Sequence, residues 1–161
     1  GSSGSVIPKF IEQINNNKKI TITDPTMTRF SITMNQALDF ILKATQKGHG
    51  AEVFIPKLKA YSLQQIHDIL SNLTNAKDHE IIGMRTGEKQ HELLINSDEM
   101  RDAWSYDNMF VLLNDLHESK NLEEVYPGIK KIEDLDVYSS AKAQQLSTEE
   151  ITENIKDLQL L

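Results

Sequence analysis

The sequence of 161 residues contains no cysteine, which excludes disulfide bonds and thiolate-ligated zinc or iron–sulfur centres. Aromatic residues make up only 6% of the chain and its net charge is -7, whereas a nucleic-acid-binding protein typically has a basic face and stacking rings. No apolar run approaches the roughly 18 to 20 residues of a membrane-spanning helix, and no signal peptide is visible. These absences predict a cytoplasmic protein that binds neither nucleic acid nor membrane.

Several catalytic motifs are also missing, among them the Gly-x-Ser-x-Gly elbow, the His-Glu-x-x-His pair and the phosphate-binding loop. The Gly-x-Gly at Gly48–Gly50 follows a predicted helix, whereas a dinucleotide-binding turn follows a strand. Tyr126 and Lys130 have the Tyr-x-x-x-Lys spacing of short-chain dehydrogenases, but Pro127-Gly128 predicts a turn in place of the required helix. The chain alone is therefore predicted to bind no dinucleotide and no metal, and to be inactive.

Amphipathic helices and short strands alternate along the rest of the chain. Capping boxes at Thr33–Gln36, Ser62–Gln65 and Ser147–Glu150 mark the starts of three helices. Such alternation favours an α/β fold, with residues 1–96 as its core and residues 97–161 as an acidic tail segment with a closing helix in the same domain. The predicted order is helix 7–14, strand 19–23, connecting segment 26–30, helix 34–46, strand 52–55, helix 63–73, strand 80–84 and a helix from 148.

The apolar spacing also predicts which faces are buried. Strand 80–84 is expected to be buried, and the structure of residues 97–137 is not assigned. The side chains expected to face inward are Leu38, Ile41, Leu42 and either Ala44 or Thr45 in the second helix, Leu63, Ile66, Leu70 and Leu73 in the third, and Ile151, Ile155 and Leu158 in the last.

The densest group of charged side chains, Arg85 to Glu92, directly follows strand 80–84 and reads Arg-Thr-Gly-Glu-Lys-Gln-His-Glu. Loops at the carboxyl end of a strand commonly hold ligand-binding groups in open α/β sheets. A solvated surface loop is the alternative. His91 has no second histidine at metal-ligand spacing, so no metal site is expected, while a small anionic ligand bound by a few arginines is compatible with the composition.

Two interpretations of Gly1 to Ser5 remain open at this point. A Gly/Ser leader is often left by a cloning vector, and such a segment carries no information about the fold. The other interpretation is a native turn whose amides point toward the start of a helix with Pro8 in its first turn, a common anion site.

Three segments of the sequence resemble one known family. Gly1–Pro8, Thr23–Phe30 and Arg85–Glu92 occur in the order and at the intervals seen in UDP-N-acetylglucosamine 4,6-dehydratases of the extended short-chain dehydrogenase/reductase superfamily. The sequence is most similar to the inverting type of the capsule and pseudaminic acid pathways, and Glu52–Lys57 and Tyr138–Glu150 also resemble segments of that group. The resemblance covers most of the chain but only the carboxyl-terminal half of such an enzyme, and it favours a native Gly1–Ser5 turn.

The resemblance implies roles for five residues. Arg29 would contact the diphosphate of a UDP-sugar, while Met27 and Thr28 would shape the nucleotide pocket. Arg85 would be a second diphosphate cation and Glu88 would accept hydrogen bonds from the ribose hydroxyls. These roles suit the side chains, because a guanidinium can bind phosphate oxygens in bidentate fashion and a carboxylate can accept bonds from neighbouring hydroxyls.

The fold that the resemblance implies is the α/β, carboxyl-terminal, substrate-binding portion of an extended short-chain dehydrogenase/reductase that lacks its Rossmann half. That missing amino-terminal half would bind NADP and supply the catalytic residues of a lyase. The expected function is UDP-sugar binding within a nucleotide-sugar 4,6-dehydratase of surface polysaccharide and glycan biosynthesis, in a fragment or a split subunit.

Two further functions stay open at this point. One is a non-catalytic sugar-nucleotide-binding or assembly module that works with a separate Rossmann subunit, and the other is a decayed homologue kept for protein contacts. Apolar surface that would face the missing half predicts exposed patches or self-association into a homo-oligomer.

Overall fold

The computed structural model describes residues 6–74, 78–113 and 121–157; Gly1 to Ser5 and Leu158, which figure in the predictions, lie outside them. None of the described helices is long and apolar enough to cross a membrane. The elements are α1 (Val6–Asn15), β1 (Ile20–Ile22), β2 (Thr28–Ser31), α2 (Met34–Lys47), β3 (Val53–Pro56), β4 (Lys59–Ser62), α3 (Leu63–Thr74), β5 (His79–Ile81), β6 (Leu93–Ile95), η1 (Glu99–Asp102), β7 (Ala103–Tyr106), β8 (Met109–Leu112), α4 (Leu122–Val125), β9 (Lys130–Lys131), β10 (Tyr138–Ser139) and α5 (Thr148–Asp157).

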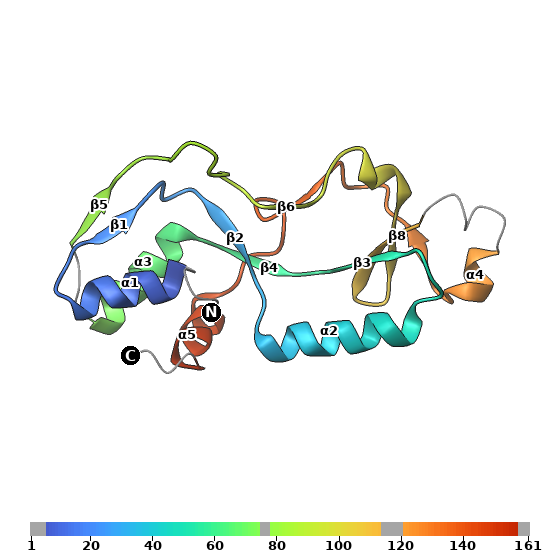
Figure 1. The fold of residues 1–161 in the computed structure, drawn as a ribbon, viewed down its shortest axis with the longest axis horizontal. Coiled ribbons are helices and arrows are strands. Elements are labelled where there is room, and N and C mark those ends of the chain that lie inside the picture. Colours follow the sequence, from blue (N-terminus) through green and yellow to red (C-terminus); the bar gives the residue numbers. More distant parts are fainter. Residues whose placement is uncertain (1–5, 75–77, 114–120, 158–161) are drawn as a thin grey trace.

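The described elements form an elongated mixed α/β fold (Figure 1). At one end, β1 and β5 pair in parallel beside α1, α3 and α5. At the other end, the antiparallel sheet has the order β3-β8-β7-β9. The antiparallel pairs β2–β4 and β6–β10 lie between these two ends, and α2 runs along the long axis below β4 and β3 in this view. The predicted α/β class is therefore confirmed.

The core of the first end joins helices from both termini of the chain. Ile66 and Leu70 of α3 are fully buried against Phe10 of α1 and Ile151 and Ile155 of α5. Each of these helices presents apolar residues at intervals of three or four positions, which places them on one face. The closing helix thus packs directly on the elements at the start of the chain.

The antiparallel sheet has its own core, in which Tyr126 is completely buried. Its hydroxyl donates a short hydrogen bond to a carboxylate oxygen of Glu52, which also accepts bonds from the amides of His49 and Gly50. Burial alone would raise the pKa of Glu52, but these hydrogen bonds outweigh it and lower the pKa to about 2. Burial and the Glu52 carboxylate raise the pKa of Tyr126 in turn.

Tyr126→Phe is expected to lower the free energy of unfolding by about 1.5 to 3 kcal/mol near pH 7, because a hydrogen bond to a charged group is lost. Since the folded pKa of Glu52 lies near 2, below its ordinary value, this stabilisation is present at neutral pH and is lost as the pH falls toward 2. Urea unfolding at several pH values measures the difference, with Tyr106→Phe as the control. An equal loss at pH 7 and pH 2 would contradict it.

The capping boxes predicted for α2, α3 and α5 are confirmed. In α2, the Thr33 hydroxyl accepts from the Gln36 amide at 3.2 Å and the Gln36 side chain accepts from the Thr33 amide at 2.9 Å. The Ser62–Gln65 and Ser147–Glu150 pairs repeat this arrangement. Each cap satisfies amides at the helix start that have no partner within the helix.

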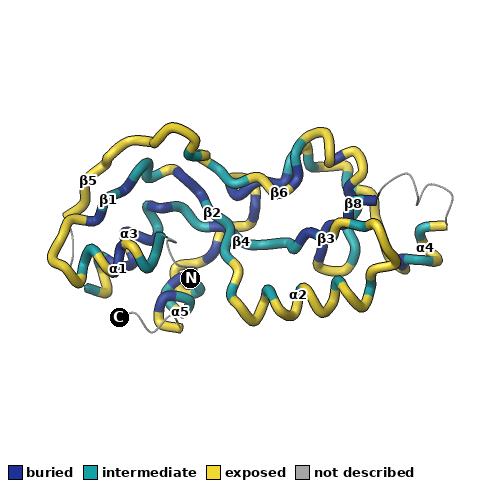
Figure 2. Tube along the Cα trace, in the orientation of Figure 1, coloured by how far each residue is buried: buried dark blue, intermediate teal, exposed yellow. Residues whose placement is uncertain are grey.

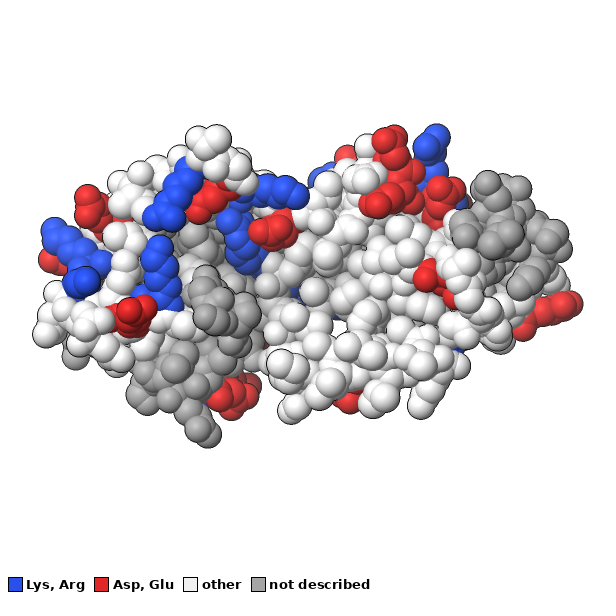
Figure 3. Space-filling view, viewed as in Figure 1, with Lys and Arg blue, Asp and Glu red and all other residues white. Residues whose placement is uncertain are grey.

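The predicted burial of α2 is wrong. Leu38, Ile41 and Leu42 are exposed by 52%, 56% and 61%, and α2 contains no buried residue. Figure 2 shows this helix as exposed along most of its length, and the surface over it in Figure 3 is largely uncharged. The helix has an apolar face, as predicted, but no described segment covers that face.

Replacing Leu38 and Leu42 together by glutamine is expected to change the free energy of unfolding by no more than about 0.5 kcal/mol, as is usual for exposed positions. The same change should reduce self-association, because an exposed apolar patch favours contact between copies. Chemical unfolding and analytical ultracentrifugation measure the two effects. A destabilisation above about 2 kcal/mol would mean that this face is packed.

Two other predictions are also corrected. The segment 26–30 is not only a connection, because β2 begins at Thr28 and pairs with β4. Strand 80–84 is shorter than predicted, since β5 covers His79–Ile81, and all three of its residues are exposed. The strand forms by backbone pairing with β1, and its side chains stay exposed even though the ring of His79 contacts that of His67.

Candidate functional site

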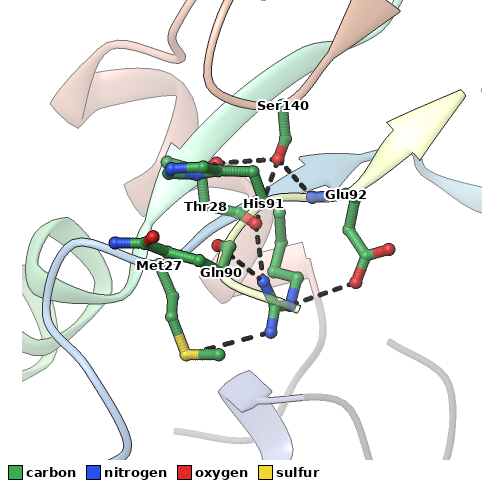
Figure 4. Close-up of polar contacts among 7 residues, drawn as sticks. Met27, Thr28, Gln90, His91, Glu92 and Ser140 are labelled. Carbon is green, nitrogen blue, oxygen red and sulfur yellow. Dashed lines mark hydrogen bonds and ion pairs between the residues drawn. The ribbon is translucent and has the colours of Figure 1, made fainter. Parts of the chain in front are cut away.

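Arg29 lies in β2, and three neighbouring groups fix the orientation of its guanidinium (Figure 4). Its Nη1 donates to the Thr28 carbonyl at 2.8 Å and to the Gln90 carbonyl at 3.3 Å. Its Nε lies 3.4 Å from Oε1 of Glu92. Nη2 contacts the sulfur of Met27 at 3.9 Å, which is a weak acceptor. The guanidinium is therefore held in place and its Nη2 retains donor capacity for a ligand.

A cavity of about 460 Å³ opens beside this guanidinium. Arg29 and Lys9 supply its cations, and Glu88 and Glu92 supply its carboxylates. Burial raises the pKa of Tyr61, which keeps its phenol neutral as a hydrogen-bonding group. The complete lining is Val6, Lys9, Phe10, Thr21, Thr23, Met27, Arg29, Phe30, Tyr61, Leu63, Glu88 and Glu92.

The loop that carries Arg85 and Glu88 forms a tight turn. The Glu88 amide donates to the Arg85 carbonyl at 3.0 Å, and the Arg85 amide donates to Oε2 of Glu88 at 2.8 Å. Gly87 has a φ of 86°, a backbone conformation that residues with a Cβ atom rarely adopt. The turn directs the partly buried Glu88 to the cavity, whereas Arg85 is exposed and is not among the lining residues.

The structure thus brings three of the five predicted site residues, Met27, Arg29 and Glu88, to one cavity. Thr28 is nearly buried, and its hydroxyl contacts His91 and Ser140, not the cavity.

Sequence reasoning missed the part played by Glu92. Arg29 pairs with Glu92, whereas the Asp24 carboxylate accepts bonds from the Thr26 amide and hydroxyl. The Thr26 hydroxyl, followed by the Thr26 amide, lowers the pKa of Asp24. The loop from Arg85 to Glu92 contained the partner of Arg29, but no spacing rule connects positions 29 and 92. Lys9 and Tyr61 were missed for the same reason, because they reach the cavity from α1 and β4.

A second cavity, of about 510 Å³, lies between α2, the β3–β4 connection, the β7–β8 turn and α5. It is lined by lysines and acids together, and Lys59 is paired with Glu150 at 2.5 Å. The Lys57 ammonium donates to the Ser105 hydroxyl at 2.6 Å. None of the five predicted site residues reaches this cavity.

Neither of the dinucleotide-related spacings forms a cofactor site among the described residues. Gly48 caps the end of α2 and Gly50 precedes β3, so this Gly-x-Gly does not join a strand to a helix. Tyr126 and Lys130 lie on either side of a turn, as predicted, and the Tyr126 hydroxyl is bonded to Glu52. Neither spacing therefore provides a dinucleotide-binding turn or a helical Tyr–Lys pair.

The family model described as "Polysaccharide biosynthesis protein" matches residues 1–114 of the chain. The chain belongs to this family. Its relatives include the UDP-glucose 4-epimerase of Rickettsia bellii, which is 36% identical over 158 residues, or 98% of this chain and 46% of the relative. The UDP-glucose 4-epimerase of Rickettsia massiliae is 34% identical over 153 residues, or 94% of this chain and 45% of the relative.

The X-ray structure of Pen from Bacillus thuringiensis matches with a TM-score of 0.80 and 34% sequence identity, over 98% of this chain and 47% of that chain. The polysaccharide biosynthesis family comprises nucleotide-sugar epimerases and dehydratases, and this fold is part of an extended short-chain dehydrogenase/reductase domain. The chain spans about half the length of the relatives that it matches.

Proposed function

We propose that the chain is the UDP-sugar-binding portion of a nucleotide-sugar 4,6-dehydratase that dehydrates UDP-N-acetylglucosamine for surface polysaccharide or glycan biosynthesis. The observation that carries the proposal is the cavity in which Arg29 and Lys9 lie together with Glu88. A UDP-sugar combines an anionic diphosphate with neutral hydroxyl-bearing rings. The two cations match the diphosphate, and the carboxylate matches the hydroxyls.

Each residue in the cavity has a specific role in this proposal. Arg29 binds diphosphate oxygens through its available Nη2, and its rigid support lowers the entropic cost of binding. The first turn of α1 reaches the cavity at Val6, so the helix amides add to the attraction for an anion. Oε2 of Glu88 is held by the Arg85 amide, and the carboxylate accepts bonds from the ribose hydroxyls.

Three predicted residues act around this centre. Met27 forms part of the wall, and Thr28 shapes the pocket through its backbone, whose carbonyl holds Arg29. Arg85 does not line the cavity and supplies a further cation, beside Arg29 and Lys9, from the exposed side of the turn that it shares with Glu88.

Catalysis in this proposal requires a separate Rossmann half that binds NADP and supplies the reacting groups. The exposed apolar face of α2 supports such a partner, because it offers a surface for another protein layer to cover. The same surface supports the alternative function, a non-catalytic sugar-nucleotide-binding or assembly module that partners a Rossmann subunit.

Calorimetric titration of the chain with UDP and UDP-N-acetylglucosamine tests the binding step, with uridine as the control that lacks phosphate. Measurable binding of both nucleotides and weaker binding of uridine are expected. No binding, even after the amino-terminal half of a relative is added, would overturn the proposal.

Mass spectrometry of UDP-N-acetylglucosamine incubated with the combined halves and NADP distinguishes the reactions. A 4,6-dehydratase releases a product lighter by one water molecule. An epimerase, the activity named for the Rickettsia relatives, leaves the mass unchanged and inverts one sugar carbon. Unaltered substrate in the presence of tight binding would favour the non-catalytic module.

A further inference from the structure

Three segments that are distant in the sequence meet next to Arg29 (Figure 4). Thr28 comes from β2, His91 and Glu92 precede β6, and Ser140 directly follows β10. Ser140 has no exposed surface and Thr28 is 9% exposed, so their hydroxyls rely on protein partners. The two hydroxyl protons therefore determine which of the contacts in this cluster are true hydrogen bonds.

The hydroxyl groups take part in four contacts. Thr28 Oγ1 lies 2.8 Å from His91 Nδ1 and 2.7 Å from Ser140 Oγ. Ser140 Oγ donates to the Thr28 carbonyl at 3.1 Å and accepts from the Glu92 amide at 2.8 Å. Each hydroxyl has one proton to donate.

Counting these protons assigns the tautomer of His91. The Ser140 proton is used for the Thr28 carbonyl, so the Thr28 hydroxyl proton must serve the contact with Ser140. The remaining contact then needs a proton on Nδ1 of His91. If Nδ1 were instead an acceptor, the Thr28 proton would point to His91, and one contact of Ser140 would have no proton. All four contacts are satisfied only when His91 is the donor.

The groups that hold Arg29 depend on this arrangement. The Thr28 carbonyl, which accepts from Ser140, also accepts from Arg29 Nη1 at 2.8 Å. The Glu92 amide donates to Ser140 while the Glu92 carboxylate lies beside Arg29 Nε. The Gln90 carbonyl accepts from both Arg29 and the Thr28 amide. Apart from the sulfur of Met27, every described partner of the guanidinium thus lies on a segment joined by this network.

We propose that Ser140 and His91 are positioning residues for Arg29, acting through the Thr28 hydroxyl and the Glu92 backbone to aim the guanidinium at a nucleotide diphosphate. The inference rests on the proposed function, because it assigns Arg29 to that diphosphate. Neither residue lines the cavity beside Arg29. Ser140 is 112 residues from Thr28 in the sequence, and the buried contact between their hydroxyls holds the two segments together.

A double-mutant cycle measured by UDP titration tests the proposal. Ser140→Ala is expected to weaken UDP binding about tenfold, and by less than about twofold when Arg29 is already alanine, because the two residues act in series. Ser139→Ala is the matched control, since Ser139 is a neighbouring buried serine. It should change the affinity by less than about twofold in either background.

The outcomes separate this proposal from the proposed function. If Arg29→Ala leaves UDP affinity unchanged, the proposed function itself fails. A second outcome is that Arg29→Ala weakens UDP binding, but Ser140→Ala lowers the affinity by the same factor whether Arg29 is present or replaced. In that case the proposed function stands and the positioning role is overturned.

His91 variants provide a second test in which Ser140 is left intact. His91→Asn keeps an N–H donor near the position of Nδ1 and should retain UDP affinity within about threefold, whereas His91→Ala should lose about tenfold. Nitrogen-15 NMR of the His91 ring should show a proton on Nδ1. A neutral ring that is protonated only on Nε2, or equal affinities for the two variants, would contradict the proposal.

Discussion

Arg29→Ala is expected to weaken the binding of UDP by about 100-fold. A charge-assisted hydrogen bond contributes about 1.5 to 3 kcal/mol, and about 2.7 kcal/mol corresponds to a factor of 100 in affinity. The effect should be large because the guanidinium is held by the carbonyls of Thr28 and Gln90 before the ligand arrives. Calorimetric titration of the two proteins under one salt condition measures the ratio.

Arg101→Ala is the matched control for this experiment. Arg101 is exposed in η1 and does not line the cavity of Arg29. It has the same charge and should leave UDP affinity within about twofold, because exposed charges at a distance are screened by salt. Equal affinities for the Arg29→Ala protein and the unchanged protein would contradict the assignment of this cavity to the diphosphate.

Leu70→Ala is expected to lower the free energy of unfolding by about 2 to 5 kcal/mol, because it leaves a cavity in a packed core. Leu70 of α3 has no exposed surface and belongs to the core that α1, α3 and α5 share. Phe10, Met27 and Leu63 belong both to this core and to the lining of the Arg29 cavity. Destabilisation here should therefore weaken the support of the site as well. Urea unfolding measures the loss.

Leu73→Ala is the control on the same helix. Leu73 was predicted to face inward but is 43% exposed, so its removal should cost less than about 1 kcal/mol. A similar loss for Leu70→Ala and Leu73→Ala would contradict the burial that distinguishes the two positions.

Local structure was predictable from the sequence because its determinants lie close together in the chain. The capping pairs Thr33–Gln36, Ser62–Gln65 and Ser147–Glu150 are each three residues apart, so their contacts could be inferred without the fold. The strands of residues 97–137 could not be inferred in this way. β8 forms by pairing with the distant β3 as well as with β7, and such long-range pairing leaves little local pattern.

Burial was predictable only where the partner of an element lies within the described chain. The apolar faces of α1, α3 and α5 pack against one another, and periodicity correctly predicted the buried residues of α3 and α5, although Leu73 is exposed. The face of α2 has the same periodicity but remains exposed. Periodicity therefore predicts that one face of a helix is apolar, but it does not predict whether another segment covers that face.

In the candidate site, too, individual residues could be predicted from the sequence but the contacts between distant positions could not. The resemblance pointed to Arg29 and Glu88, and the structure brings both to one cavity. The pair of Arg29 with Glu92 and the contact of Thr28 with Ser140 join positions that no spacing rule relates. These contacts could be found only in three dimensions.

Nitrogen-15 NMR of the chain during titration with UDP tests the central claim most directly, because it distinguishes between the two cavities. The largest shifts are expected at the amides that surround the cavity beside Arg29, namely those of Thr21, Thr23, Arg29 and Glu88. Shifts that instead gather around the second cavity, at Lys43, Lys57 and Asp107, would contradict it.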